Sequence, residues 1–270
     1  MPLFYSTFII YPLILLGSMG SLLGCLLVWQ RLTFVGEALA HGALLGIGLS
    51  LLFDVAPLPL YTSICISISV VFGWWSAHRS EALTAWQAHL NSMSHGLLGV
   101  GLLLLGFFPQ GLALAEMLLF GDILALEQES AWHLSFFYAG CTLLLCTIVR
   151  KLISLQISPT LVRTEGGHVY GVTLLFFGLL GAFVGLSIPL VGVFLLIGVM
   201  ILPATAAQIF GTSPWGMIAI AQILSVSGSI VGFFASQFYD LPMGPSIVSA
   251  HFMLYLLLLI AKSSRTLFNK

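Results

Sequence analysis

Long apolar segments recur along the whole sequence and constrain its fold more than any other feature. A helix needs about 20 apolar residues to cross the roughly 30 Å of hydrocarbon in a bilayer. Only 6% of the residues are charged, and the mean hydropathy is +1.11. The pattern predicts an all-α polytopic membrane protein with about nine transmembrane helices. The apolar runs are residues 5–29, 38–53, 55–77, 92–108, 131–149, 169–189, 190–210, 214–236 and 245–261.

The number of crossings can be eight or ten, because the run at 38–53 is short and only Pro189 separates the sixth run from the seventh. A transmembrane β-barrel would show alternating lipid-facing and polar residues. Continuous apolar stretches such as 102–105 and 254–260 exclude that alternation. The polar segments between the runs are too short for a separate catalytic domain. The sequence therefore predicts one transmembrane domain over residues 1–270.

The eight Lys and Arg residues predict the orientation in the membrane. With nine spans they all fall on one side, which the positive-inside rule identifies as the cytoplasm. The N-terminus is then outside and the C-terminus inside, and the first run is expected to be a retained span because no basic residue precedes it. An outer face rich in acids attracts cations. Six of the nine acidic residues are predicted to lie there: Asp54, Glu116, Asp122, Glu127, Glu129 and Asp240.

Two ionisable residues at a helical spacing are the strongest candidates for chemistry, because ionisable groups inside a membrane are costly and mark functional sites. Glu37 and His41 are four residues apart, so they share one helical face on which a carboxylate and an imidazole can bind one divalent cation. These ligand types suit zinc, and also manganese or iron. The alternative is a Glu to His hydrogen bond that joins two helices. The spacing alone favours neither.

Three further residues are weaker metal candidates. His95, at the start of the fourth run, is either a third ligand or a packing histidine, and packing is the favoured role. Asp122 and Asp240 lie in predicted outer loops, where either can receive a cation, although capping a helix or forming a turn is the commoner role of such an Asp. The remaining histidines have no acid or His partner at a ligand-like spacing. We interpret them as interfacial: His78, His89, His133, His168 and His251.

Glycines and cysteines are interpreted as packing residues. Glycine pairs four residues apart let helix backbones approach closely and indicate no particular cargo. Such pairs are Gly20 and Gly24, Gly42 and Gly46, Gly181 and Gly185, and Gly228 and Gly232. The cysteines form no close pair of the kind expected of a thiolate metal site. They are Cys25, Cys65, Cys141 and Cys146.

The chain is not expected to be an enzyme, and in particular not an ATPase. None of its three lysines follows a glycine, so the Gly-Lys pair of a phosphate-binding loop is absent. A separate ATPase subunit would have to dock, and residues 158–167 predict a short cytoplasmic helix for that purpose, begun by Ser158 and Pro159 and ended by glycines. A helix resting on the lipid surface is the weaker alternative, because one or two turns offer too little apolar area. The predicted docking residues are Pro159, Leu161, Val162, Arg163, Glu165 and Gly166.

Five segments, in the same order along the chain, resemble the membrane permeases of bacterial zinc and manganese ABC importers, and most closely the zinc-uptake permeases. The similarity extends from about Leu22 to Lys262. It includes Gly36-Glu37-Ala38-Leu39-Ala40-His41, which resembles the family's Gly-Asp-Ala-Leu-Ala-His, and a Leu-Phe-Gly-Asp motif. The five similar segments are residues 31–48, 119–122, 158–167, 191–207 and 240–245.

The resemblance implies a type II ABC importer-like permease bundle in the bacterial cytoplasmic membrane, surrounded by lipid and with no nucleic-acid partner. It implies a homodimer around one central pathway, two ATPase subunits on the cytoplasmic side and a soluble metal-binding protein outside. Glu37 and His41 would be the metal-handling pair of that pathway. The ion, zinc with manganese or iron as the alternatives, would be a substrate moved by alternating access, and no tightly bound cofactor is expected.

The chain departs from the family pattern at three places. Glu37 stands where the family usually has Asp, which keeps the charge and lengthens the arm. Gln208 and Ile209 replace basic residues, and Met243 replaces a small one. Two rival functions are a proton-coupled metal carrier that works without an ATPase and an intramembrane enzyme. The second is disfavoured, since the sequence has no His-Glu-x-x-His motif.

Overall fold

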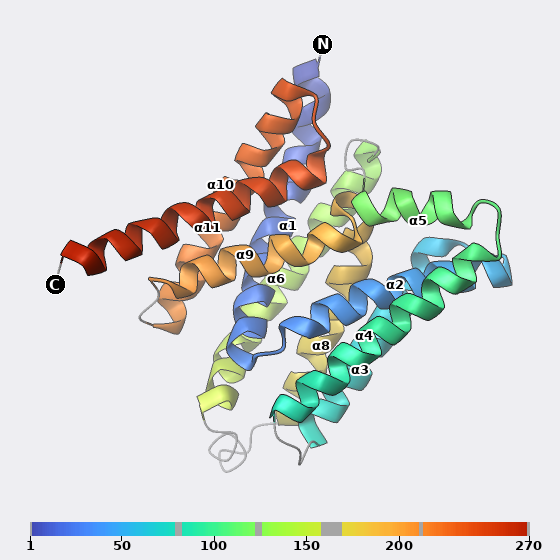
Figure 1. Ribbon diagram of the computed structural model, residues 1–270, viewed down its shortest axis with the longest axis horizontal. Coiled ribbons are helices and arrows are strands. Elements are labelled where there is room, and N and C mark those ends of the chain that lie inside the picture. The colour runs from blue at the N-terminus through green and yellow to red at the C-terminus, as the bar shows by residue number, and fades with distance from the viewer. Residues whose placement is uncertain (1, 79–82, 122–125, 158–168, 211–212, 269–270) are drawn as a thin grey trace. The chain divides into compact units, whose positions relative to one another are not determined.

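The computed structural model describes residues 2–78, 83–121, 126–157, 169–210 and 213–268, and every regular element in these ranges is a helix (Figure 1). The helices are α1 (Pro2–Gln30), α2 (Thr33–Phe53), α3 (Pro57–His78), α4 (Leu83–Gly106), α5 (Gly111–Phe120), α6 (Gln128–Ile157), α8 (Val169–Val191), α9 (Val193–Gln208), α10 (Pro214–Tyr239) and α11 (Met243–Phe268).

Eight of these helices are long and apolar enough to cross a bilayer: α1, α2, α3, α4, α6, α8, α10 and α11. They correspond to eight of the nine apolar runs. The remaining run, 190–210, forms α9, a shorter apolar helix of 16 residues. The prediction of an all-α polytopic membrane protein is confirmed.

Several element boundaries differ from the sequence prediction. Helix α4 begins at Leu83 rather than 92, α6 continues to Ile157 and α11 to Phe268. Helix α2 begins at Thr33, before the expected start at 38, so Glu37 lies inside the helix. Pro189 lies within α8, and the break before α9 falls at Gly192, whose φ of 93° is a conformation that favours glycine. The segment 109–130, expected to be a polar connection, contains the ten-residue helix α5, which is too short to span a bilayer.

The chain folds into two compact units. The central unit comprises Gln30–Gly121 and Leu143–Phe194, and the terminal unit comprises Met1–Trp29, Asp122–Thr142 and Leu195–Lys270. Residues 158–167, predicted to form the docking helix, lie outside the described residues, as does Asp122.

In the central unit, α2 packs against both α3 and α4, and α3 packs in turn on α8 (Figure 1). Glycines allow these close approaches. A Cβ at Gly46 would overlap the Tyr61 backbone on α3, and a Cβ at Gly101 on α4 would overlap the α2 backbone at Leu44 and Leu45. The glycine prediction is confirmed at this packing, which fixes how α4 lies along α2.

In the terminal unit, α10 contacts both α1 and α11 through buried polar groups. The Ser225 hydroxyl donates to the Gly17 carbonyl at 2.8 Å, and the Gln222 side chain donates to the Ser18 carbonyl at 2.8 Å. His251 on α11 is 2% exposed and lies against Gly228, with Nε2 3.0 Å from the Ser225 carbonyl oxygen. The interpretation of His251 as an interfacial residue is therefore wrong, because it is an interhelical packing residue.

Candidate metal site

Helix α2 holds Glu37 and His41 one turn apart on a face that meets α4. The spacing of four residues places both side chains on the same side of the helix. His41 is 5% exposed, whereas Glu37 is half-buried. The pair therefore forms a polar site inside an otherwise apolar span, where polar groups are retained when they serve a function.

Helix α4 adds His95 to this pair. One potential ligand atom of each of the three residues, a carboxylate oxygen or an imidazole nitrogen, lies within 4.8 Å of the other two. The ring centroids of His41 and His95 are 6.3 Å apart. His95 is exposed in the single chain, which does not fit the role of a satisfied packing histidine favoured by the sequence. In the described part of the chain, no other group of three His, Cys, Asp or Glu side chains converges in this way.

The ligand set suits an exchangeable transition-metal ion. Zinc bonds to imidazole nitrogen and carboxylate oxygen are about 2.1 Å long, which places ligand atoms about 3.4 Å apart around a tetrahedral ion. The upper limit of 4.8 Å thus needs only small side-chain rotations to reach ligand geometry. Two imidazoles and one carboxylate leave at least one coordination position open. Three ligands, one of them exposed, can hold an ion without enclosing it.

Ser94 was missed by the sequence reasoning. It is fully buried, and its Oγ lies 2.8 Å from Nδ1 of His41. Nδ1 is therefore engaged with α4, and Nε2 is the ring nitrogen left to face an ion. A serine next to His95 carries no signal of its own in the sequence, because only the packing of α4 on α2 brings it to His41.

Two further residues, Asp122 and Asp240, were predicted as metal candidates. Asp240 is exposed and ends α10 in the terminal unit, with φ 53° and ψ 45° and its backbone N–H bonded to the Ser236 carbonyl. Asp122 lies outside the described residues, and so do the predicted docking residues 159–166. Cys25, Cys65 and Cys141 are buried, while Cys146 is exposed.

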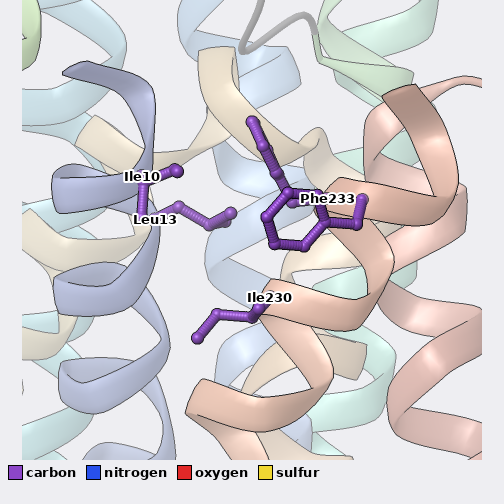
Figure 2. Close-up of a pocket in the computed structure, with 5 residues that line it drawn as sticks. Ile10, Leu13, Ile230 and Phe233 are labelled. Carbon is purple, nitrogen blue, oxygen red and sulfur yellow. The ribbon is translucent and has the colours of Figure 1, made fainter. Parts of the chain in front are cut away.

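An apolar cavity of about 140 Å³ lies in the terminal unit, between α1 and α10. Figure 2 shows Ile10 and Leu13 from α1 facing Ile230 and Phe233 from α10. The fifth lining residue is Phe234. No lining side chain offers a nitrogen, oxygen or sulfur ligand, so the cavity cannot coordinate a cation.

Comparison with known proteins gives relatives over almost the whole chain. The chain is 27% identical over 261 residues to the high-affinity zinc uptake system membrane protein ZnuB of Haemophilus influenzae, covering 94% of this chain and 98% of that protein. It is 23% identical to the manganese import system permease protein ScaB of Streptococcus parasanguinis, covering 90% of this chain and 86% of that protein.

The fold matches a solved structure, PsaBC from Streptococcus pneumoniae in complex with Fab. The TM-score is 0.73 at 19% identity, covering 94% of this chain and 90% of the matched chain. The model of the ABC 3 transport family matches residues 7–262. The chain therefore belongs to the ABC 3 transport family of membrane permeases.

Proposed function

We propose that this chain is the membrane permease of an ATP-driven importer of divalent transition metal ions, with zinc as its cargo. The observation that carries the proposal is the convergence of Glu37, His41 and His95 on one side of the α2–α4 pair. In this proposal the three side chains hold the ion briefly as it crosses, and the open coordination positions let it leave. A closed four-ligand site would retain zinc.

The donor atoms support zinc over manganese. Two imidazole nitrogens suit zinc, while manganese favours sites built mainly from carboxylate, carbonyl and water oxygens. The similarity to ZnuB of Haemophilus influenzae points the same way. Manganese is the second candidate, because the chain also resembles ScaB, whose name describes manganese import.

The proposed energy source and partners are inferred from the sequence of the chain and from its family. No lysine follows a glycine, so ATP hydrolysis belongs to a separate subunit, which we expect to dock at residues 158–167 on the cytoplasmic side. A soluble metal-binding protein delivers the ion outside. The exposed side of His95 supports a homodimer in which two copies line one pathway. With α9 counted as a ninth crossing, the charge pattern supports an N-terminus outside the bacterial cytoplasmic membrane.

Each group has a defined role in transport by alternating access. The half-buried Glu37 supplies the negative charge that attracts the cation, and His41 and His95 supply nitrogen ligands that favour a transition metal over calcium or magnesium. ATP binding and hydrolysis in the partner subunits drive the change between outward-open and inward-open states. The site then faces one side of the membrane at a time.

Uptake into proteoliposomes tests this function. The permease is assembled with its ATPase and binding protein, and zinc, manganese and iron uptake are compared with and without ATP. We expect ATP-dependent zinc uptake that is lost in the double variant Glu37→Ala with His41→Ala. The control His78→Gln changes an exposed histidine bonded to its own helix and should transport normally. Uptake by the chain alone, driven by a proton gradient, would instead establish a secondary carrier.

A further inference from the structure

We propose that Ser94 is a positioning residue that selects the metal-binding tautomer of His41. Its hydroxyl oxygen accepts a hydrogen bond from Nδ1–H of His41, so the proton stays on Nδ1 and the Nε2 lone pair is free for the ion. This inference rests on the proposed function and deepens it, because it explains how the site is prepared before an ion arrives.

The geometry of the Ser94–His41 pair is that of a well-formed buried hydrogen bond. The Oγ to Nδ1 distance is 2.8 Å, and both residues are buried, with Ser94 at 0% and His41 at 5% exposure. Water therefore does not compete for Nδ1. A buried hydrogen bond also acts in a medium of lower dielectric, where it fixes orientation more strongly than it would at the surface.

The direction of this bond decides whether His41 can bind metal. Neutral imidazole has one N–H donor and one acceptor nitrogen. If Nδ1–H donates to Ser94, Nε2 carries the lone pair that a metal needs. If the Ser94 hydroxyl instead donates to Nδ1, the proton moves to Nε2 and the ligand is lost. In the described part of the chain, the Ser94 hydroxyl has Nδ1 of His41 as its hydrogen-bond partner, and the direction of this bond is the inference that the measurements below test.

Helix packing holds Ser94 in place independently of any ion. On α2, a Cβ at Gly48 would press against the Leu104 side chain of α4, and on α4 a Cβ at Gly101 would overlap the α2 backbone. These contacts set the register of the two helices. Helix α4 therefore places buried Ser94 next to Nδ1 of His41 and places exposed His95 in the metal site. One helix thus supplies both a ligand and the group that orients another ligand.

Metal affinity provides the first test. Zinc binding to the purified chain in nanodiscs is measured by competition with a fluorescent chelator. Loss of an orienting partner typically lowers metal affinity about 10- to 100-fold, so Ser94→Ala should raise Kd by that factor, and Ser94→Thr should restore most of the affinity. The matched control is Ser50→Ala, which removes another buried serine hydroxyl, bonded within α2 to the Ile47 carbonyl at 2.7 Å. It should bind zinc like the wild type.

The tautomer itself provides a test that needs neither metal nor a stable variant at position 94. Nitrogen NMR of histidine-labelled wild-type chain, without metal, reports which ring nitrogen of His41 carries the proton, with His41→Gln used to assign the signal. We expect the Nδ1–H tautomer in the wild type and a mixture in Ser94→Ala. An Nε2–H tautomer in the wild type, or unchanged zinc affinity in Ser94→Ala, would overturn the inference. Failure of wild-type chain to bind zinc would instead remove the proposed function while leaving the tautomer result to stand.

Discussion

The α2–α3 hairpin of the central unit and the α10–α11 hairpin of the terminal unit share a skeleton but carry different polar side chains. At one constant offset along the sequence, the same residue types recur in both hairpins, and they lie at the helix contacts and at the turn between the helices. The matching pairs are Gly42 with Gly228, Gly46 with Gly232, Ser50 with Ser236, Asp54 with Asp240, and Pro59 with Pro245.

The matching residues make matching contacts. A Cβ at Gly46 would overlap the Tyr61 Cα atom, and a Cβ at Gly232 would overlap the Ile247 Cα atom at the corresponding position. Both first helices end on an Asp with φ 53°, whose backbone N–H bonds to the carbonyl of the serine four residues earlier. The recurring residues therefore specify how each hairpin closes.

The interhelical bond also recurs, with different chemistry. In the first hairpin the Cys65 thiol donates to the Leu39 carbonyl at 3.5 Å. In the second, His251 occupies the position of Cys65, and its Nε2 lies 3.0 Å from the carbonyl oxygen of Ser225. Because a carbonyl only accepts, Nε2 is the donor. The His251–Ser225 hydrogen bond thus takes the place of the Cys65–Leu39 bond. It is expected to be the stronger of the two, because a thiol is a weak donor.

The difference between the hairpins separates structure from function. The second hairpin has Ile223 and Ser227 at the positions of Glu37 and His41, so the proposed ligands are additions to a shared skeleton. Asp54 and Asp240, by contrast, are present in both hairpins and belong to the shared skeleton. Asp240 caps its helix as Asp54 caps the other, which favours the capping alternative for Asp240 over a role in cation binding.

The largest expected effect is a loss of zinc affinity on substitution of His41 that is absent on substitution of its counterpart, Ser227. Removing one of three metal ligands, His41→Ala, should weaken zinc binding by about 100-fold or more, roughly 3 kcal/mol. Ser227→Ala should leave zinc affinity unchanged. Titration of zinc against both purified variants in nanodiscs checks the prediction. Equal zinc affinities in the two variants would mean that His41 of the α2–α3 hairpin is not a zinc ligand.

The next effect tests the shared skeleton. Gly46→Val and Gly232→Val each place side-chain atoms where the partner helix backbone lies, and overpacking of this kind destabilises by about 1–3 kcal/mol or more. Both variants should therefore lose thermal stability to a similar degree in detergent. Gly96→Ala is the control, because a Cβ there meets no atom within 4 Å. Tolerance of either valine would show that the two hairpins do not close in the same way.

A smaller effect is expected from the interhelical bonds. His251→Ala removes a buried hydrogen bond and leaves the Ser225 carbonyl without that donor, which costs about 1–3 kcal/mol. Cys65→Ala removes a weaker thiol donor and should cost less. The unfolding midpoints of the two variants, measured by the same thermal assay, give the comparison. A larger loss for Cys65→Ala would reverse the proposed ranking of the two bonds.

The smallest effect concerns the two Asp caps. Asn adopts the left-handed conformation about as readily as Asp, so Asp54→Asn and Asp240→Asn should each change stability by less than about 0.5 kcal/mol. If Asp240 only caps its helix, Asp240→Asn should also keep wild-type zinc uptake in the assembled transporter. A marked loss of uptake in Asp240→Asn alone would restore the cation-binding alternative.

The sequence predicted the spans well, because the bilayer demands long apolar helices and few other patterns resemble them. The Glu37–His41 pair was also predictable, since a spacing of four residues settles which face both occupy. The nearness of His95 was not, because it depends on how α4 lies along α2, and Gly48 and Gly101 set that register only through contacts between helices.

The missed features share a physical cause. His251 looked interfacial because no acid or histidine accompanies it in sequence, but its partner is a backbone carbonyl on another helix. The break at Gly192 was assigned to Pro189, although a proline can remain within a membrane helix when surrounding groups compensate for its missing N–H. Tertiary contacts decided both outcomes, and local sequence patterns do not record them.

The most direct test of the central claim is X-ray absorption spectroscopy of zinc bound to the purified chain. The account predicts a first shell of nitrogen and oxygen at about 2.0–2.1 Å with the scattering signature of two imidazoles, falling to one imidazole in His95→Ala. A sulfur ligand at about 2.3 Å, or a spectrum unchanged by His95→Ala, would contradict the site formed by Glu37, His41 and His95.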